Sequence, residues 1–231
     1  MRALRLGQGT RMLDVATGTG ALALRAAELG AVVTGVDIAP ALLERARSAA
    51  AEARLPIELR VGDAERLPFK PGSFDVVASA QGVVFAADRE AVARELARVC
   101  RRGGMLALTC PVGWGFPFEL ARILSTFRLG ARGAWMTPFA WGAPEEAERL
   151  LAGAFELELE ELNAPFQAGT AVEGWTVYSE SFGPLADVLR SIGAAARSEL
   201  RRRVIELLSR YATPSGVTAP RPLLLVVGRR R

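Results

Sequence analysis

The chain begins with short, mostly apolar runs separated by segments whose apolar residues recur every three or four positions. Residues 13–16, 31–36, 74–79 and 105–109 are runs of strand length. The run at 31–36 is the most continuously apolar, as expected of a strand covered on both faces of a sheet. Strands that alternate with helices pair in parallel, so the sequence predicts a doubly wound α/β sheet.

Three helices are predicted between these strands. The first covers residues 21–29, directly after a cluster of glycines. The second begins at Pro40, where the missing N–H of proline costs nothing, and ends before Pro56. The third is expected to be broken by Gly103-Gly104. Its buried stripe is Val92, Leu96, Val99 and Cys100.

Two further segments alternate apolar and polar residues, which is typical of a strand with one wetted face. IELRV at 57–61 predicts a strand near the edge of the sheet. FELELEEL at 155–162 directs Phe155, Leu157 and Leu159 inward and its glutamates outward. This second strand therefore needs an antiparallel neighbour, and residues 223–227 are the candidate.

The pattern changes after Pro111. The segment 113–143 is rich in Gly, Pro, Trp and Phe and contains one clear helical piece, near 118–127. A short helix is expected from Pro144, because the glutamates in its first turn favour the N-terminal end of the helix dipole.

Composition limits the class of protein. The chain has 231 residues, half of them hydrophobic, which suits one α/β domain. No run of about 18 uninterrupted apolar residues predicts a membrane span, and MRALRLGQGT predicts no secretory signal. The two cysteines, Cys100 and Cys110, do not make a disulfide framework. We expect buried thiols in a cytoplasmic protein.

The chain is basic, with 29 basic against 25 acidic residues. Nucleic acid is nevertheless disfavoured as a partner, because Arg201, Arg202 and Arg203 fall off the buried stripe of a predicted helix and are interpreted as a solvated face. The sequence contains no histidine. This absence argues against a Ser-His-Asp triad, and no metal site is expected.

The stretch LDVATGTGALAL, which begins at Leu13, joins a strand to a helix through a glycine-rich turn. Asp37 ends the next strand, 17 residues beyond Gly20, where an acid can bind two ribose hydroxyls. The turn also satisfies a loose dinucleotide-binding pattern. By itself it therefore does not show which nucleotide-containing ligand the protein binds. A nicotinamide enzyme is disfavoured, because neither Tyr178 nor Tyr211 belongs to a Tyr-x-x-x-Lys motif.

Four motifs in order, MLDVATGTG, TGVDIAP, VGDAERLPFKPGSFDVV and RVCRRGGMLAL, resemble the class I S-adenosylmethionine-dependent methyltransferases. The resemblance is to the small-molecule branch related to quinone-biosynthesis C-methyltransferases, of the methyltransferase type 11 kind. It is dense over residues 12–112 and looser from there to the end. It implies a Rossmann-like sheet of seven strands, mostly parallel, with the last strand antiparallel, and S-adenosylmethionine as the cofactor.

The resemblance also implies roles for individual residues. Asp37 would take the ribose hydroxyls, Ile38 would pack on the adenine, and Asp63 with the backbone of Ala64 would bind the edge of the adenine. Ala16 stands where many members have glycine, which is tolerable if its φ is negative. The methionine end would be held by Asp14, Ala16, Thr17, Gly18 and Gly20. The donor methyl and the acceptor would meet at Ser79, Ala80 and Gln81.

Simpler interpretations stay open for several of these residues. The glycines can merely turn the chain, Asp37 can cap the helix that begins at Pro40, Asp63 can be a turn residue and Gln81 a loop residue. Methyl transfer is an in-line displacement that depends mainly on alignment in a dry site. We therefore expect no dedicated base, and Gln81 is the candidate catalytic residue only as an orienting hydrogen-bond group.

A small, flat, apolar acceptor is expected beneath the aromatic segment, although the same side chains can instead pack that segment onto the sheet. The lining candidates are Trp114, Phe116, Phe118, Trp135, Met136, Phe139 and Trp141. Accordingly, residues 1–112 are expected to form the cofactor-binding half of one domain, 113–143 a cap insertion over the acceptor site, and 144–231 the half that completes the sheet.

Only about 11 residues precede the first strand, where the family usually carries covering helices. A truncated start, a lid from a second subunit in a homodimer, or an open site would each explain this. The leading hypothesis is transfer of a methyl group to an apolar or aromatic small molecule. The alternatives are an RNA or protein methyltransferase, a catalytically weak cofactor-binding interaction module, and a nucleotide-dependent oxidoreductase.

Overall fold

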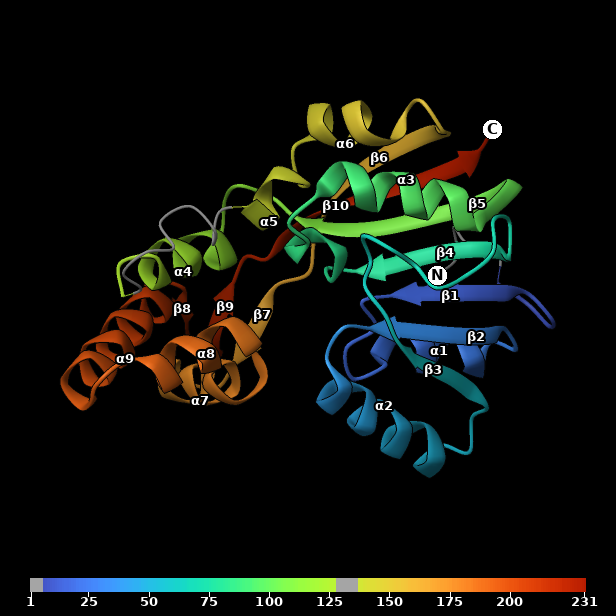
Figure 1. Ribbon diagram of the computed structural model, residues 1–231. Coiled ribbons are helices and arrows are strands. Elements are labelled where there is room, and N and C mark those ends of the chain that lie inside the picture. Colours follow the sequence, from blue (N-terminus) through green and yellow to red (C-terminus); the bar gives the residue numbers. More distant parts are fainter. Residues whose placement is uncertain (1–5, 128–136) are drawn as a thin grey trace. The chain divides into compact units, whose positions relative to one another are not determined.

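The computed structural model describes residues 6–127 and 137–231 (Figure 1). They divide into two compact units. The first contains the chain through Cys110 together with Pro144–Glu160 and Leu224–Arg231, and the second contains Pro111–Ala143 and Glu161–Leu223. The aromatic segment therefore shares its unit with a long C-terminal segment.

A seven-stranded sheet in the order β3-β2-β1-β4-β5-β10-β6 organises the first unit. The strands are β1 Arg11–Val15, β2 Val32–Asp37, β3 Ile57–Val61, β4 Phe74–Ala80, β5 Cys100–Pro111, β6 Phe155–Asn163 and β10 Pro222–Arg230. The pairs β1–β2, β2–β3, β1–β4 and β4–β5 are parallel. The sheet is mostly parallel with one antiparallel strand, which confirms the predicted fold class, and β3 lies at the edge as predicted.

Helices α1 (Ala21–Glu28) and α2 (Pro40–Glu52) pack beside each other, as do α3 (Arg89–Val99) and α6 (Pro144–Leu151). Helix α2 buries Leu43, Ala46 and Ala50 at helical spacing. Helix α3 begins where Asp88 Oδ1 accepts a hydrogen bond from the Ala91 N–H at 2.8 Å, and such a cap satisfies one of the free donors of a helix start.

The prediction that a helix runs through Cys100 and is broken by Gly103-Gly104 was wrong. Strand β5 already starts at Cys100, and its register against β4 shifts between the pairs Phe74↔Cys100 and Val76↔Met105. A Cβ at Gly104 would lie 2.8 Å from the Asp75 carbonyl oxygen and 2.9 Å from Cys100 Sγ. The glycines mark a bulge inside a strand, and only glycine fits this close approach of two backbones.

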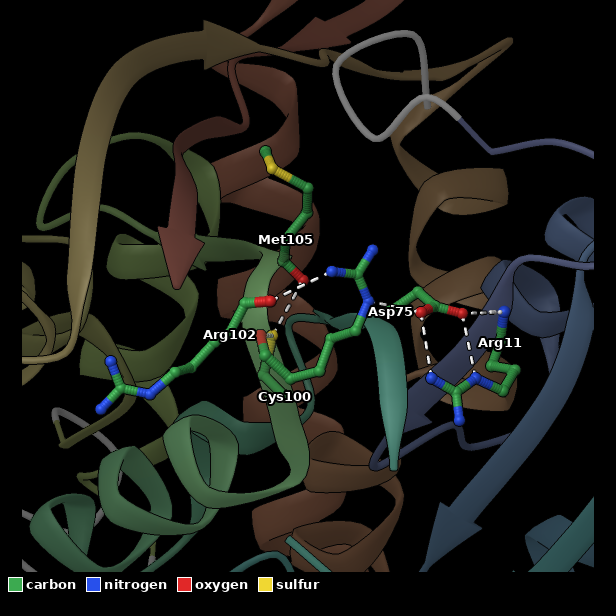
Figure 2. Close-up of polar contacts among 6 residues, drawn as sticks. Arg11, Asp75, Cys100, Arg102 and Met105 are labelled. Carbon is green, nitrogen blue, oxygen red and sulfur yellow. Dashed lines mark hydrogen bonds and ion pairs between the residues drawn. The ribbon is translucent and has the colours of Figure 1, made fainter. Parts of the chain in front are cut away.

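Asp75 joins the first residues of three strands (Figure 2). Its Oδ2 accepts hydrogen bonds from the backbone N–H and the Nε of Arg11, at 2.9 and 3.1 Å. Its Oδ1 accepts from Arg101 Nε at 2.6 Å. The Arg11 guanidinium, with help from Arg101, holds the pKa of this carboxyl well below its usual range. The carboxylate therefore bridges β1, β4 and β5.

The second unit has its own core and its own sheet. The helices are α4 Phe116–Leu124, α5 Thr137–Ala140, α7 Ala171–Ser181, α8 Gly183–Ser191 and α9 Ala194–Ser209. The antiparallel sheet β7-β9-β8 is formed by Phe166–Ala168, Gly216–Ala219 and Ala212–Thr213. The core includes Phe116, Leu120, Leu185, Leu200 and Val204. Within 6–127 and 137–231, no helix has both the length and the apolar character needed to cross a membrane.

Helix α9 carries the arginine run, and the structure corrects one part of its interpretation. Arg201 and Arg202 are exposed, as expected. Arg203 is half-buried, donates a hydrogen bond to Thr126 Oγ1 at 2.8 Å and lies over the Phe127 ring at 5.5 Å. The long aliphatic part of the Arg203 side chain lets its guanidinium reach residues just after the C-terminal end of α4, although Arg203 itself lies beside the buried stripe of α9.

Strand β1 ends in a left-handed turn. Ala16 has a φ of +54°, so the condition of a negative φ, under which alanine would be tolerated without strain, is not met. Gly18 and Gly20 follow with φ values of +57° and +87°. A Cβ at Gly82 would lie 2.5 Å from both the Cβ and the carbonyl oxygen of Ala16. The turns that follow β1 and β4 therefore touch, and this contact keeps Ala16 in its strained conformation.

We expect Ala16→Gly to leave the free energy of unfolding unchanged or to raise it by up to about 1 kcal/mol, because relief of the left-handed strain outweighs the flexibility of glycine. Ala51→Gly, at an exposed helical position of α2, is the matched control and should lower it by about 1 kcal/mol. Urea unfolding measures both. Equal losses in the two variants would show that Ala16 carries no strain.

Asp75→Asn tests the bridge at the strand starts. Because the folded-state pKa lies below the unfolded value of about 3.9, the carboxylate stabilises the fold at neutral pH and this contribution is lost as the pH falls below about 4. Its arginine partners are half-exposed, so we expect a loss of only about 1 kcal/mol at pH 7. The difference from wild type in urea unfolding should shrink at pH 3; a constant difference contradicts the ionic role.

Candidate functional site

A pocket of about 240 Å³ opens where the carboxyl ends of four neighbouring parallel strands meet. Every strand from β1 to β4 is followed by residues that line it. The lining residues are Ala16, Asp37, Ile38, Gly62, Asp63, Ala64, Glu65, Gly82, Val83, Phe85, Ala86 and Ala87. In open α/β sheets this edge is where ligands bind, beside the point at which the strand order reverses.

Asp37 is the best-oriented polar group of the pocket. Its side chain is buried, its Oδ2 accepts the Gly18 N–H at 2.8 Å, and its Oδ1 accepts the Ala39 N–H at 2.9 Å. A carboxylate has about four acceptor positions, so each oxygen can accept one more hydrogen bond from a ligand. Ala39 is the N-cap residue of α2, and its own side chain makes no capping hydrogen bond. Asp37 therefore also holds the backbone at the start of α2, as the simpler interpretation of this residue expects, in addition to the glycine-rich turn.

The glycine-rich turn is supported from below by Asp14. Thr17 Oγ1 donates a hydrogen bond to Asp14 Oδ2 at 2.6 Å, and the Thr17 N–H donates to the Val36 carbonyl at 3.0 Å. Asp14 is 1% exposed and lies outside the pocket lining. A Cβ at Gly20 would lie 3.2 Å from the Cβ of Ala46, so glycine lets α1 start close to α2.

Two apolar side chains of the pocket are unusually exposed. Ile38 is 69% and Phe85 54% accessible, and both line the pocket. Asp63 and Ala64 line it as well. Asp63 Oδ1 accepts the Glu65 N–H at 2.9 Å, so Asp63 is a turn residue in addition to a wall residue. Exposed apolar groups with a few oriented polar groups suit a partly flat organic ligand.

The end of β4 shapes the loop that follows. Ser79 is buried and its Oγ accepts the Val83 N–H at 3.2 Å. Gln81 has a φ of +60° and its N–H donates to the Thr109 carbonyl at 3.0 Å. Ser79, Ala80 and Gln81 lie outside the lining of this pocket. Sequence reasoning missed Glu65 and the segment after Gln81, although their position directly behind parallel strands was a usable signal.

The predicted acceptor-lining aromatics separate into groups. Phe116 and Trp141 are fully buried, and Phe116 contacts Tyr178 with ring centroids 4.9 Å apart. These two are therefore interior residues, and Phe116 belongs to the core of the second unit. Trp114 is half-exposed, and Phe118 and Phe139 meet edge to face at 5.2 Å. Trp135 and Met136 lie outside the described residues.

Comparison with known proteins agrees with this geometry. The methyltransferase domain family matches residues 13–108. An uncharacterized protein of Mycobacterium tuberculosis is 35% identical over 241 residues, covering 97% of this chain and 83% of that protein. The structure of the YcgJ protein from Bacillus subtilis superposes with a TM-score of 0.69 at 18% identity, covering 100% of this chain and 95% of that one.

Two relatives with assigned activities each match somewhat less than half of this chain. Demethylmenaquinone methyltransferase of Thermus thermophilus is 45% identical over 100 residues, 42% of this chain and 46% of that enzyme. Aklanonic acid methyltransferase of a Streptomyces species is 40% identical over 116 residues, 48% of this chain and 53% of that enzyme. Together with the strand order and the acid behind the second strand, these matches show that the chain belongs to the class I S-adenosylmethionine-dependent methyltransferases.

Proposed function

We propose that the protein transfers the methyl group of S-adenosylmethionine to an apolar or aromatic small molecule. The observation that carries the cofactor part is the Asp37 carboxylate, which two backbone N–H groups orient in the wall of the pocket. Two neighbouring hydroxyls of a ribose match the remaining acceptor positions of such a carboxylate. The pocket therefore fits the nucleoside part of the cofactor.

The other residues of the pocket fit the same ligand. Ile38 and Phe85 offer apolar surface to an adenine ring, and Asp63 with the Ala64 backbone offers hydrogen bonds to its edge. The methionine end is assigned to the turn of Ala16, Thr17, Gly18 and Gly20, above Asp14. When bound, S-adenosylmethionine supplies an electrophilic methyl group on a sulfonium. The contribution of the chain is to align the two reactants and exclude water.

The acceptor assignment rests on relatives and on surface charge. The two relatives with assigned activities are named for small molecules, demethylmenaquinone and aklanonic acid. Many arginines of this basic chain are already paired: Arg202 contacts Glu199 and Glu206, and Arg149 contacts both Glu90 and Glu146. Paired arginines offer little to a polyanion, so these features favour a small molecule over RNA.

Recognition of the acceptor is assigned to the segment 113–143, with Gln81 as an orienting group at the end of β4. Trp114, Phe118 and Phe139 are the predicted lining residues of this segment that keep some exposure in the described part of the chain. Formation of S-adenosylhomocysteine is the assay: we expect turnover with hydroquinones or aromatic polyketides and none with bulk RNA or with a protein mixture. Turnover restricted to RNA or protein would overturn the acceptor assignment.

Asp37→Ala tests the cofactor site. S-adenosylmethionine and S-adenosylhomocysteine should raise the melting temperature of the wild type, whereas NAD should not. Loss of two hydrogen bonds to a charged acceptor should weaken cofactor binding by roughly tenfold to a hundredfold in the variant. Asp187→Ala, at an exposed residue of α8, is the control and should bind normally. Equal thermal shifts in wild type and Asp37→Ala would remove Asp37 from the site.

Asp14→Asn tests the buried acid beneath the turn. Burial raises the pKa of Asp14 to about 7, against the hydrogen bond from Thr17. The folded state therefore binds this proton more tightly than the unfolded state, whose pKa is about 3.9, and stability falls as the pH rises from about 4 to about 7.

Asparagine does not titrate, so we expect Asp14→Asn to be more stable than wild type at pH 8, by up to about 4 kcal/mol. The difference should shrink as the pH falls and vanish near pH 4, where the unfolded wild type is protonated as well. Thermal melting at the two pH values measures this, with the exposed Asp187→Asn as control. A difference that is independent of pH would contradict the elevated pKa.

A further inference from the structure

Glu65 links two loops that leave strands far apart in the sheet. Its Oε1 accepts hydrogen bonds from the backbone N–H groups of Ala87 and Asp88, at 2.7 and 2.9 Å. Glu65 follows β3, whereas Ala87 follows β4, and β2 and β1 lie between these two strands. Three strand spacings amount to about 14 Å. The two loops must therefore approach each other beyond the strand ends, where the pocket is.

The loop that carries Glu65 is itself fixed. Asp63 accepts the Glu65 N–H through its side chain and the Arg66 N–H, at 3.0 Å, through its carbonyl. Further along, Glu95 of α3 accepts the Leu67 N–H at 2.7 Å, and Arg98 donates to the Leu67 carbonyl at 2.9 Å. Glu65 thus extends from a loop that is tied both to itself and to α3.

The segment on the other side is held at its two ends. At its start, Gly82 lies against Ala16, and the Val83 N–H donates to Ser79 Oγ. At its end, Glu65 accepts the two N–H groups described above. Phe85 lies between these attachments, in the short 3-10 helix Val83–Phe85, and is half-exposed in the pocket wall. Its position therefore depends on the Glu65 link.

We propose that Glu65 is a positioning residue of the cofactor site and that Phe85 is the side chain it positions, as an aromatic wall against the adenine base. This inference rests on the proposed function. Glu65 acts through the backbone of Ala87 and Asp88, since its Oε1 accepts both N–H groups. Aromatic rings that stack on a base contribute more than their buried area alone, so a fixed Phe85 raises affinity for the adenosyl group.

Titration calorimetry with S-adenosylhomocysteine tests the positioning role. Glu65→Ala should weaken binding roughly tenfold, because two hydrogen bonds to a charged acceptor are lost. Glu65→Gln should bind within about threefold of wild type, since one amide oxygen can accept both N–H groups. Glu156→Ala, an exposed glutamate of β6, is the matched control and should bind like wild type. Glu65→Asp keeps the charge, but its side chain is too short to reach the N–H groups of Ala87 and Asp88. Its affinity should therefore resemble that of Glu65→Ala, and it replaces Glu65→Ala in the experiment if that variant does not fold.

A double-mutant cycle separates positioning from a merely structural effect. Phe85→Ala should also weaken binding roughly tenfold. If Glu65 acts through Phe85, Glu65→Ala combined with Phe85→Ala should bind about as Phe85→Ala alone, because coupled residues are not additive. Three outcomes would each overturn the inference. The first is a double variant whose loss of affinity is the product of the two single losses. The others are a Glu65→Gln variant that binds as weakly as Glu65→Ala, and a Glu65→Ala variant that binds like wild type.

Binding of S-adenosylhomocysteine by the wild type distinguishes a failure of the proposed function from a failure of the positioning role of Glu65. If the wild-type protein does not bind S-adenosylhomocysteine, the proposed function is contradicted. Wild-type protein that binds it, together with variants of Glu65 that bind equally well, would contradict only the positioning role.

Discussion

The two oxygens of the Asp37 carboxylate determine how the functional edge of the sheet is built. One oxygen holds the turn that follows β1, and the other holds the backbone that leads into α2. Both turns lie next to each other because β1 and β2 are parallel neighbours in register, with Val15 beside Val36. A single buried carboxylate thereby fixes the geometry of the turn and remains available to a ligand.

Strain and buried charge are concentrated around the same place. Of the three non-glycine residues with positive φ in the described part of the chain, Ala16 and Gln81 stand directly behind a strand of the pocket edge, and Arg54 follows α2. Asp14 is buried below the turn, where its ionised form is costly. Strained residues and shifted acids tend to gather at functional sites. The opposite end of the sheet differs, since the Asp75 carboxylate there is paired with arginines and joins strands.

The order of strands and helices in the first unit could be predicted because each element is long enough to show its period. The antiparallel sheet β7-β9-β8 could not be predicted, since its strands have only three, four and two residues and such runs carry no period. The place of Asp37 in the pocket wall could be predicted from its position at the end of a strand. The Glu65 link does not, because backbone N–H groups leave no mark in a sequence. The burial of Phe116 could not be predicted either, because aromatic side chains mark cores and ligand sites alike.

The place of β10 in the sheet has a consequence for how the chain is assembled. β10 lies between β5 and β6, although it is the last strand in the sequence. Until residues 222–230 have left the ribosome, β5 presents an unpaired edge and β6 has no neighbour to join. Unpaired edges invite pairing with other chains. A nascent chain would therefore need protection of β5 until translation has passed β10, because the sheet cannot close before residues 112–221, which separate the two strands, have been made.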